Sequence, residues 1–119
     1  MSAQGQLTAN DVAVQLARLG RELDGLVAAL DGAEREAVNR REDFTMAHAR
    51  AFLKAEGSME FRKHYAVEQT HAERLAAETA DVLVRGLRRQ IDAVRVRIDI
   101  GRSVGAALRA EAALAGGPS

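Results

Sequence analysis

A heptad repeat of apolar residues restricts the fold of this chain more than any other feature. In the first half, apolar residues recur at alternating spacings of four and three: Val12, Leu16, Leu19, Leu23, Leu26, Leu30, Ala33, Ala37, and, after an interruption at Arg40, Phe44, Ala47 and Ala51. A second series begins at residue 84 and runs to Ala112. Such repeats place apolar side chains along one side of an α-helix. The sequence therefore predicts two long helices.

The segment AVRVRIDIG, residues 93–101, alternates apolar and charged side chains, as a half-buried strand would. Over the thirty residues 82–111, however, only a helical period fits, and no turn signal bounds the supposed strand. We therefore predict that this segment is helical and that the chain is all-α.

This second helix has two apolar sides, since Val94 and Ile98 face one seam while Val96 and Ile100 face another. A helix with two apolar sides usually has more than one neighbour, so a homo-oligomer is expected. The residues predicted to mediate self-association are Val84, Leu87, Ile91, Val94, Ile98, Gly101, Gly105 and Leu108.

A break at residues 55–60, AEGSME, separates the two series. Gly57 suits a helix C-cap, and Ser58 suits the N-cap of the following helix. We predict a long antiparallel helical hairpin, coiled-coil-like, with its corner near Gly57. The expected organisation is a disordered N-terminus at 1–7, one α-hairpin domain at 8–115 with helices 8–56 and 58–114, and a flexible tail at 116–119.

A corner at Gly57 also predicts the register of the hairpin. Residue i then lies opposite roughly residue 114 − i, at 1.5 Å per residue in both helices. The expected pairs are Leu30 with Val84, Leu16 with Ile98, and Val12 with Arg102.

Composition excludes several functional classes. The chain has no cysteine, so disulfides and thiolate chemistry are absent, and no apolar run approaches the ~20 residues of a membrane span. A cytoplasmic protein without membrane contact is expected. Net charge is zero, but residues 85–109 hold seven arginines against two aspartates, a local excess of +5. That asymmetry favours an anionic partner or self-association.

Arginines also recur every seven residues beside the second seam, at Arg88, Arg95, Arg102 and Arg109. Their planar guanidinium groups suit phosphate, which they bind through paired hydrogen bonds. The alternative is that they form ion pairs with acidic residues of the first helix, with Glu22, Glu36 and Asp43 as candidates.

A second basic group surrounds the predicted corner. It combines cations with most of the aromatic residues of the chain: His48, Arg50, Lys54, Arg62, Lys63 and His64, with Phe52, Phe61 and Tyr65. Single-stranded nucleic acid is bound by this combination, phosphates on cations and bases on rings. Alternatively, Phe52 and Phe61 plug the hairpin tip and the charges are simply solvated.

Catalytic and metal-binding signals are weak. Glu68 and His71 form a Glu-x-x-His that matches half of a di-iron site, with Asp43 opposite in the predicted register. The heptad phase sends Glu68 and His71 to outer positions, however, and the sequence contains no phosphate loop or nucleophile motif. We expect a non-enzymatic protein with no metal and no cofactor.

The span from His48 to Glu111 resembles the phage UvsY-type recombination mediators and, more closely, small helical proteins of actinobacterial phages that look like their divergent relatives. The shared pattern is a basic helix, a short break and a long helix with a late LRRQID…R…GRS…LRAE run. The resemblance implies binding of single-stranded DNA, ring assembly through residues 84–112, and help to a RecA-like recombinase in displacing single-strand-binding protein. It also implies that Arg50 contacts phosphate, with His48 replacing the lysine of the family.

Two functional hypotheses follow. The first is a self-assembling recombination mediator that binds single-stranded DNA through His48, Arg50, Lys54, Arg62, Lys63, Arg88, Arg95 and Arg102. The alternative is a structural or regulatory coiled-coil adaptor whose partner is a protein.

Overall fold

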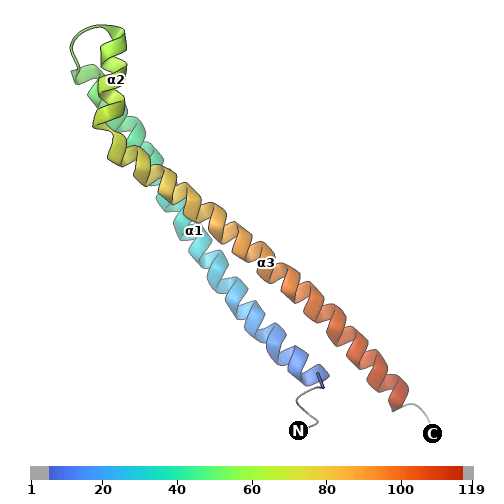
Figure 1. Cartoon of the computed structure of the whole chain (residues 1–119). Helices are drawn as coiled ribbons and strands as arrows, with labels where there is room; N and C mark the ends of the chain where they lie inside the picture. Colours follow the sequence, from blue (N-terminus) through green and yellow to red (C-terminus); the bar gives the residue numbers. More distant parts are fainter. Residues whose placement is uncertain (1–5, 117–119) are drawn as a thin grey trace. The chain divides into compact units, whose positions relative to one another are not determined.

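The computed structural model describes residues 6–116, which form three α-helices: α1 (Ala9–Lys54), α2 (Met59–Gln69) and α3 (His71–Ala115). The long helices α1 and α3 pack antiparallel, and the short α2 connects them (Figure 1). Residues 93–101 lie within α3, so the predicted helix is confirmed there. Contacts divide the chain into two units: unit 1 joins the residues up to Val27 with those from Arg89 onward, and unit 2 spans Ala28–Arg88.

Local hydrogen bonds set the ends of the helices. At the start of α1, the Thr8 amide donates to Asp11 Oδ2 (3.0 Å) and the Asp11 amide donates to Thr8 Oγ1 (3.1 Å), a reciprocal cap. Ser58 caps α2 by accepting from the Phe61 amide (3.1 Å). Gly57 has a φ of 119°, which L side chains rarely adopt. The predicted corner at Gly57 and Ser58 is confirmed.

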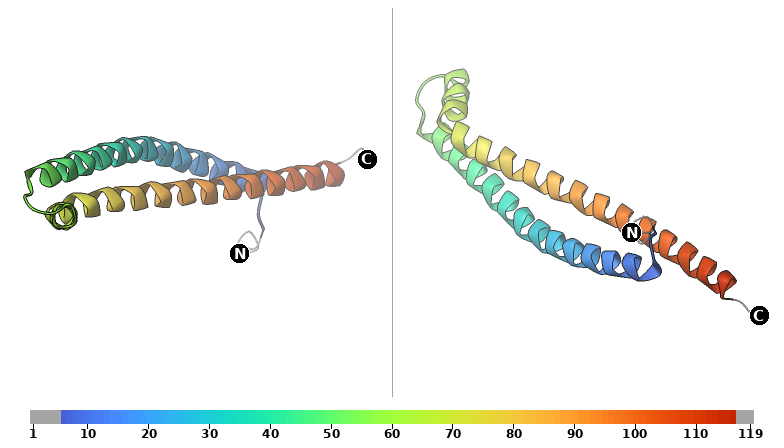
Figure 2. Two further views of the ribbon diagram at one scale, coloured as in Figure 1. Left: turned by 90° about the horizontal axis from the view of Figure 1, so that it is seen from above. Right: turned by 60° about the horizontal axis from the view of Figure 1, so that its bottom comes forward.

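Unit 2 is held together by small side chains. Ala33 and Ala37 of α1 pack in one buried cluster with Ala80 and Val84 of α3, flanked by the half-buried Leu30 and Leu87. Alanine lets the two backbones approach closely but buries little apolar area per residue. Figure 2 shows the two helices side by side through this region from two further directions.

The second predicted helix, 58–114, is interrupted in the structure at Thr70, between α2 and α3. Thr70 has φ −113° and ψ 18°, outside the helical range, and is buried. Its hydroxyl donates to the Ala66 carbonyl (2.6 Å), which also accepts from the Thr70 amide (3.2 Å). A threonine hydroxyl that bonds to the carbonyl four residues earlier bends helices, and α2 is set at an angle to α3 (Figure 1). The first helix also ends two residues earlier than predicted, at Lys54.

Unit 1 buries larger side chains, among them Val12 and Leu19 of α1 and Ile91 and Val94 of α3. Every series member from Val12 to Ala37 and from Val84 to Leu108 is buried or half-buried, so the predicted seams are confirmed over these ranges, whereas Ala112, the last predicted member of the second series, is exposed. Among the residues described, ten apolar side chains are buried and five of them are alanine. The interior therefore contributes little hydrophobic stabilisation for a chain of this length.

The register within unit 1 differs from the prediction by three residues. A Cβ placed on Gly101 would lie 2.8 Å from Cδ2 of Leu16, and one on Gly105 would lie 3.3 Å from Cγ1 of Val12. Leu16 therefore lies against Gly101 rather than Ile98, and Val12 against Gly105 rather than Arg102. The predicted register assumed an uninterrupted second helix starting at the corner, and the junction at Thr70 removes that assumption.

At the termini, Gln6 and Leu7 have no regular structure and are exposed, and Gly116 lies in a turn. The rest of the predicted disordered N-terminus and flexible tail, residues 1–5 and 117–119, lies outside the described residues. Across residues 6–116, no helix combines the length and apolar character needed to cross a lipid bilayer.

Candidate nucleic-acid interface

One predicted DNA contact at the corner, Arg62, is engaged within the fold. Its guanidinium stacks on the Phe52 ring, with Cζ 4.5 Å from the ring centroid, and its Nε donates to the Phe52 carbonyl (3.2 Å). This pair ties α2 to the end of α1. A half-buried cation stacked on an aromatic ring stabilises the fold, so the main role of Arg62 is structural.

The aromatic residues of the corner divide into a covered and an exposed set. Phe52 is half-buried beneath Arg62, as the hypothesis of a plugged tip predicts. Phe61 is 55% exposed, and its ring stacks on Tyr65 with centroids 6.3 Å apart. The Phe61 ring is thus partly accessible to a base, as single-strand recognition requires.

The remaining basic residues of the corner differ in their surroundings. Arg50, Lys54 and Lys63 are exposed, and among the described residues none of the three forms an ion pair. His48 is half-buried with its ring edge-on to Phe44. His64 lies 3.2 Å from the Glu60 carboxylate. Three exposed cations therefore remain for an anionic ligand at this end of unit 2.

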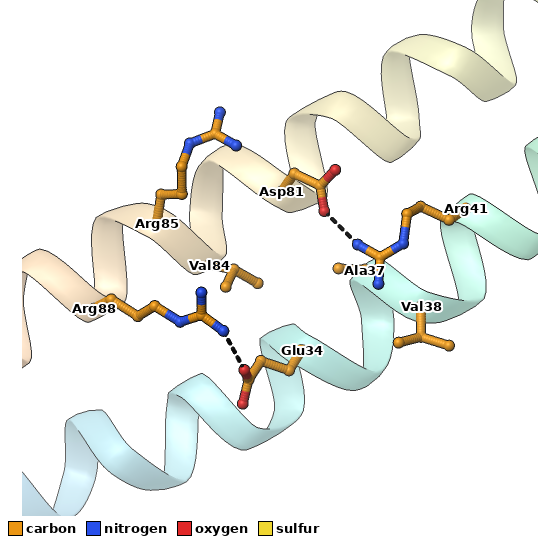
Figure 3. Close-up of a pocket in the computed structure, with 8 residues that line it drawn as sticks. All are labelled: Glu34, Ala37, Val38, Arg41, Asp81, Val84, Arg85 and Arg88. Carbon is orange, nitrogen blue, oxygen red and sulfur yellow. Dashed lines mark hydrogen bonds and ion pairs between the residues drawn. The ribbon is translucent and has the colours of Figure 1, made fainter.

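The arginine series behaves differently in the two units. In unit 2, Arg88 donates to Glu34 of α1 (2.6 Å), and Arg41 of α1 donates to Asp81 of α3 (2.7 Å). Both ion pairs rim a shallow pocket floored by Ala37 and Val84 (Figure 3). Arg88 is therefore paired across the helices, as the ion-pair hypothesis predicts.

The acidic partners in unit 2 are not those suggested by the sequence. Glu34 and Asp81 were not among the proposed acids, and Glu36 instead pairs with Arg40 of its own helix (3.3 Å). Among the described residues, Glu22 and Asp43 form no ion pair. Glu22, Glu36 and Asp43 lie on the other edge of the α1 seam, whereas in an antiparallel pair the edge that carries Arg88 faces the α1 edge that carries Glu34 and Arg41.

In unit 1, the arginine series has no acidic partner on α1 among the described residues. Arg95 and Arg102 come only within 4.0 Å and 3.9 Å of Asp92 and Asp99 on their own helix, and all four side chains are exposed. Contacts this long in solvent contribute little. Arg109, two turns farther along, forms no ion pair within residues 6–116.

The register explains this difference. The Arg88–Glu34 pair identifies the edge of α1 that lies across from this series, and seven-residue steps along both antiparallel helices from that pair lead to Val27 for Arg95, Gly20 for Arg102 and Ala13 for Arg109. None of these α1 residues accepts a hydrogen bond through its side chain. Three guanidinium groups thus follow one edge of α3, each about 10 Å from the next at 1.5 Å per residue. We call Arg95, Arg102 and Arg109 the arginine edge.

The residues predicted to mediate self-association lie inside the hairpin. Val84, Ile91, Val94 and Gly105 are buried against α1, and Leu87, Ile98, Gly101 and Leu108 are half-buried. In the closed hairpin these side chains are not available to a second chain. The apolar residues that α3 does expose are on its other side and include Val96 and Ile100.

The candidate metal residues do not assemble. Glu68 belongs to α2 and His71 to α3, so the junction at Thr70 interrupts the Glu-x-x-His. His71 Nδ1 instead lies 3.0 Å from an Arg74 guanidinium nitrogen. Across residues 6–116, no group of three acidic or histidine side chains is arranged to hold a metal ion.

Comparison of the chain with family models, with curated proteins and with solved structures gives no match. The resemblance to UvsY-type mediators therefore stays a prediction based on the charge and helix pattern alone.

Proposed function

We propose that this chain is a non-enzymatic accessory protein that binds single-stranded DNA through its phosphates, works as a homo-oligomer, and serves as a recombination mediator. The observation that carries the proposal is the arginine edge of unit 1. Three guanidinium groups stand in solvent opposite a glycine, an alanine and a valine of α1. Arginines without acidic partners at regular spacing suit a polyanion, whose condensed counterions they release on binding.

The corner of unit 2 supports the same proposal independently. Arg50, Lys54 and Lys63 supply exposed charge near the accessible ring of Phe61. Cations and an aromatic face hold a single strand without reading its sequence. No side chain arrangement here is suited to base edges in a groove, so binding without sequence preference is expected.

A specific observation favours the alternative, a coiled-coil adaptor. In unit 2, the pairs Arg88–Glu34 and Arg41–Asp81 show arginines of this chain neutralised between helices. If an acidic segment of a protein partner occupied the arginine edge in the same manner, DNA affinity would be negligible at moderate salt. The two functions therefore predict different affinities for single-stranded DNA at moderate salt.

The experiment is a fluorescence-anisotropy titration of labelled oligothymidine at several salt concentrations. A triple variant, Arg95→Gln, Arg102→Gln and Arg109→Gln, removes three contacts and should lower the slope of log affinity against log salt by about 2, at ~0.7 per single-strand phosphate. The matched control is Arg18→Gln, Arg21→Gln and Arg35→Gln, which removes equal charge from exposed positions of α1. Equal slopes for both variants would refute the arginine edge as the DNA site.

A single substitution on α1 tests the same edge without touching an arginine. Gly20 has open space around it, so Gly20→Glu fits sterically and places a carboxylate across from Arg102. We expect weaker DNA binding with unchanged helicity, since a paired guanidinium is less available to phosphate. Gly25→Glu adds the same charge away from the edge and should weaken binding less.

The corner is tested by Arg50→Ala with Lys54→Ala. This pair should weaken DNA binding and flatten its salt dependence while leaving the size of the oligomer unchanged. If DNA binding is confirmed, stimulation of a RecA-like recombinase on DNA coated with single-strand-binding protein tests the mediator role. If the chain binds DNA but does not stimulate the recombinase, its function is restricted to binding single strands.

A further inference from the structure

A second apolar series runs along α3 in unit 1, on the side away from α1. It comprises Ala93, Val96, Ile100, Ser103, Ala107, Ala110 and Leu114, again at alternating spacings of three and four, with Ser103 as its one polar member. Its large members are open to solvent: Val96 is 56%, Ile100 58% and Leu114 85% exposed. We call this series the outer seam.

The outer seam lies opposite the seam that packs on α1. Val94, for example, is buried against α1, and Val96 lies two residues, or about 200°, farther round the helix. One partner helix therefore cannot cover both sides. Exposed apolar side chains spread at random need no explanation, but a sustained heptad of them indicates a helical partner.

We propose that the outer seam binds the outer seam of a second copy of this chain, with the two α3 helices parallel and in register. A second copy offers the same heptad repeat over the same length. In the parallel arrangement each seam residue meets its counterpart, so Ile100 packs on Ile100 and Val96 on Val96. The alanine positions between them permit close approach of the helices.

The charges beside the outer seam favour this orientation. One flank carries Asp92 and Asp99, and the other carries Arg97, Val104 and Glu111; the four charged residues are exposed. In a parallel pair, a residue on the first flank lies across from the residue five positions later on the second flank of the other copy. Asp92 of each copy then faces Arg97 of the other. An antiparallel pair over the same strip would instead set Asp99 against Ala106 and Asp92 against Ala113, so neither aspartate would face an arginine.

The available area is sufficient for a concentration-dependent dimer. Residues 93–114 form a strip about 33 Å long on a helix about 10–12 Å wide. Specific interfaces need roughly 1,000 Å² in total, or about 500 Å² from each copy. The outer seam with its charged flanks is close to this threshold, so we expect dissociation on dilution.

This inference rests on the homo-oligomer of the proposed function and identifies the surface through which the copies bind. Its test contains no DNA, so the outcome does not depend on DNA binding. A failure of the arginine-edge titration would leave it standing. Loss of self-association with intact strand binding would overturn this inference alone.

Sedimentation equilibrium of the full chain over a range of concentrations tests the interface. Val96→Lys with Ile100→Lys should raise the dissociation constant at least about 30-fold, since two apolar contacts and a like-charge conflict are lost. The control, Val14→Lys with Val38→Lys, changes two similarly exposed valines of α1 and should leave it unchanged. A monomeric wild-type chain, or equal effects in both variants, would overturn the proposal.

Orientation is tested by disulfide formation, which the natural chain cannot undergo because it has no cysteine. Ile100→Cys and Val96→Cys, made as separate variants, should each crosslink rapidly to their own copies under mild oxidation, since both positions can meet their counterparts only in the parallel register. Val38→Cys provides the matched exposed control. If either variant crosslinks no faster than Val38→Cys, the parallel arrangement is wrong.

Discussion

Substitution of Gly101 provides the sharpest test of the packing in unit 1. Alanine in place of glycine within a helix stabilises by about 1 kcal/mol. At Gly25, where no atom lies within 4 Å of an added Cβ, Gly25→Ala should show this full gain. At Gly101 the added Cβ would lie 2.8 Å from Leu16 Cδ2 and 3.4 Å from its Cγ. Because that first distance is below any ordinary contact, Leu16 must move.

The size of the difference follows from the cost of that movement. Overpacking of a fitted seam costs about 1–3 kcal/mol, and the half-buried position of Leu16 favours the lower part of this range. Gly101→Ala should therefore range from neutral to about 1 kcal/mol destabilising. Its free energy of unfolding should be at least about 1 kcal/mol lower than that of Gly25→Ala, which corresponds to a Tm about 4 °C lower.

Thermal and urea unfolding, followed by circular dichroism at one fixed protein concentration, measures this difference. A Leu16→Ala background provides the control, because removing the leucine removes the clash. In that background Gly101→Ala should recover its gain of about 1 kcal/mol. Equal stabilisation by Gly101→Ala and Gly25→Ala in the wild-type background would refute the contact between Leu16 and Gly101, and with it the register of unit 1.

Three further predictions concern the corner, the ion pairs and the start of α1. Gly57→Ala should lower the free energy of unfolding by about 1–2 kcal/mol, measured in urea, because φ is 119° and the added Cβ would lie 3.3 Å from the Phe61 ring. A double-mutant cycle on Arg88 and Glu34, whose side chains are 58% and 44% exposed, should give a coupling below about 1 kcal/mol that shrinks with salt; a salt-independent coupling would contradict this. Hydrogen bonds from the Thr8 amide and hydroxyl hold the pKa of Asp11 below its ordinary value, so its contribution to stability is present above the unfolded pKa and is lost as pH falls through the folded one. An NMR titration of Asp11 should show its pKa rising in Thr8→Ala, which keeps the amide bond but removes the hydroxyl, and no change would exclude the hydroxyl as a cause.

The two seams could be predicted because apolar residues that repeat every 3.5 positions lie on one side of a helix, and that side is the one that becomes buried. Leu19 and Val94 lie on a 3.5-residue repeat, and a helix with that repeat buries one stripe whatever its partner is. The corner was predictable for a similar reason, since Gly57 and Ser58 act through local backbone geometry. Neither prediction needed any knowledge of contacts across the helices.

The junction at Thr70 was not predictable from the same signals. One threonine in a run of charged and apolar residues is common in helices, and no glycine or proline marks the site. What distinguishes Thr70 is burial, which directs its hydroxyl to the Ala66 carbonyl rather than to water. The register error of three residues followed from missing this junction.

The arginines of α3 show why their roles could not be read from their own helix. Arg88 and Arg102 occupy the same heptad position, yet the first is bound to Glu34 and the second faces Gly20. The difference resides wholly in α1, whose residues on that edge change from charged in unit 2 to small and apolar in unit 1. A stripe of arginines is therefore neither an ion-pair ladder nor a phosphate site in itself. On this chain the packing partner α1 neutralises one end of the stripe and leaves the other end charged in solvent, which is where an anionic ligand gains most from binding.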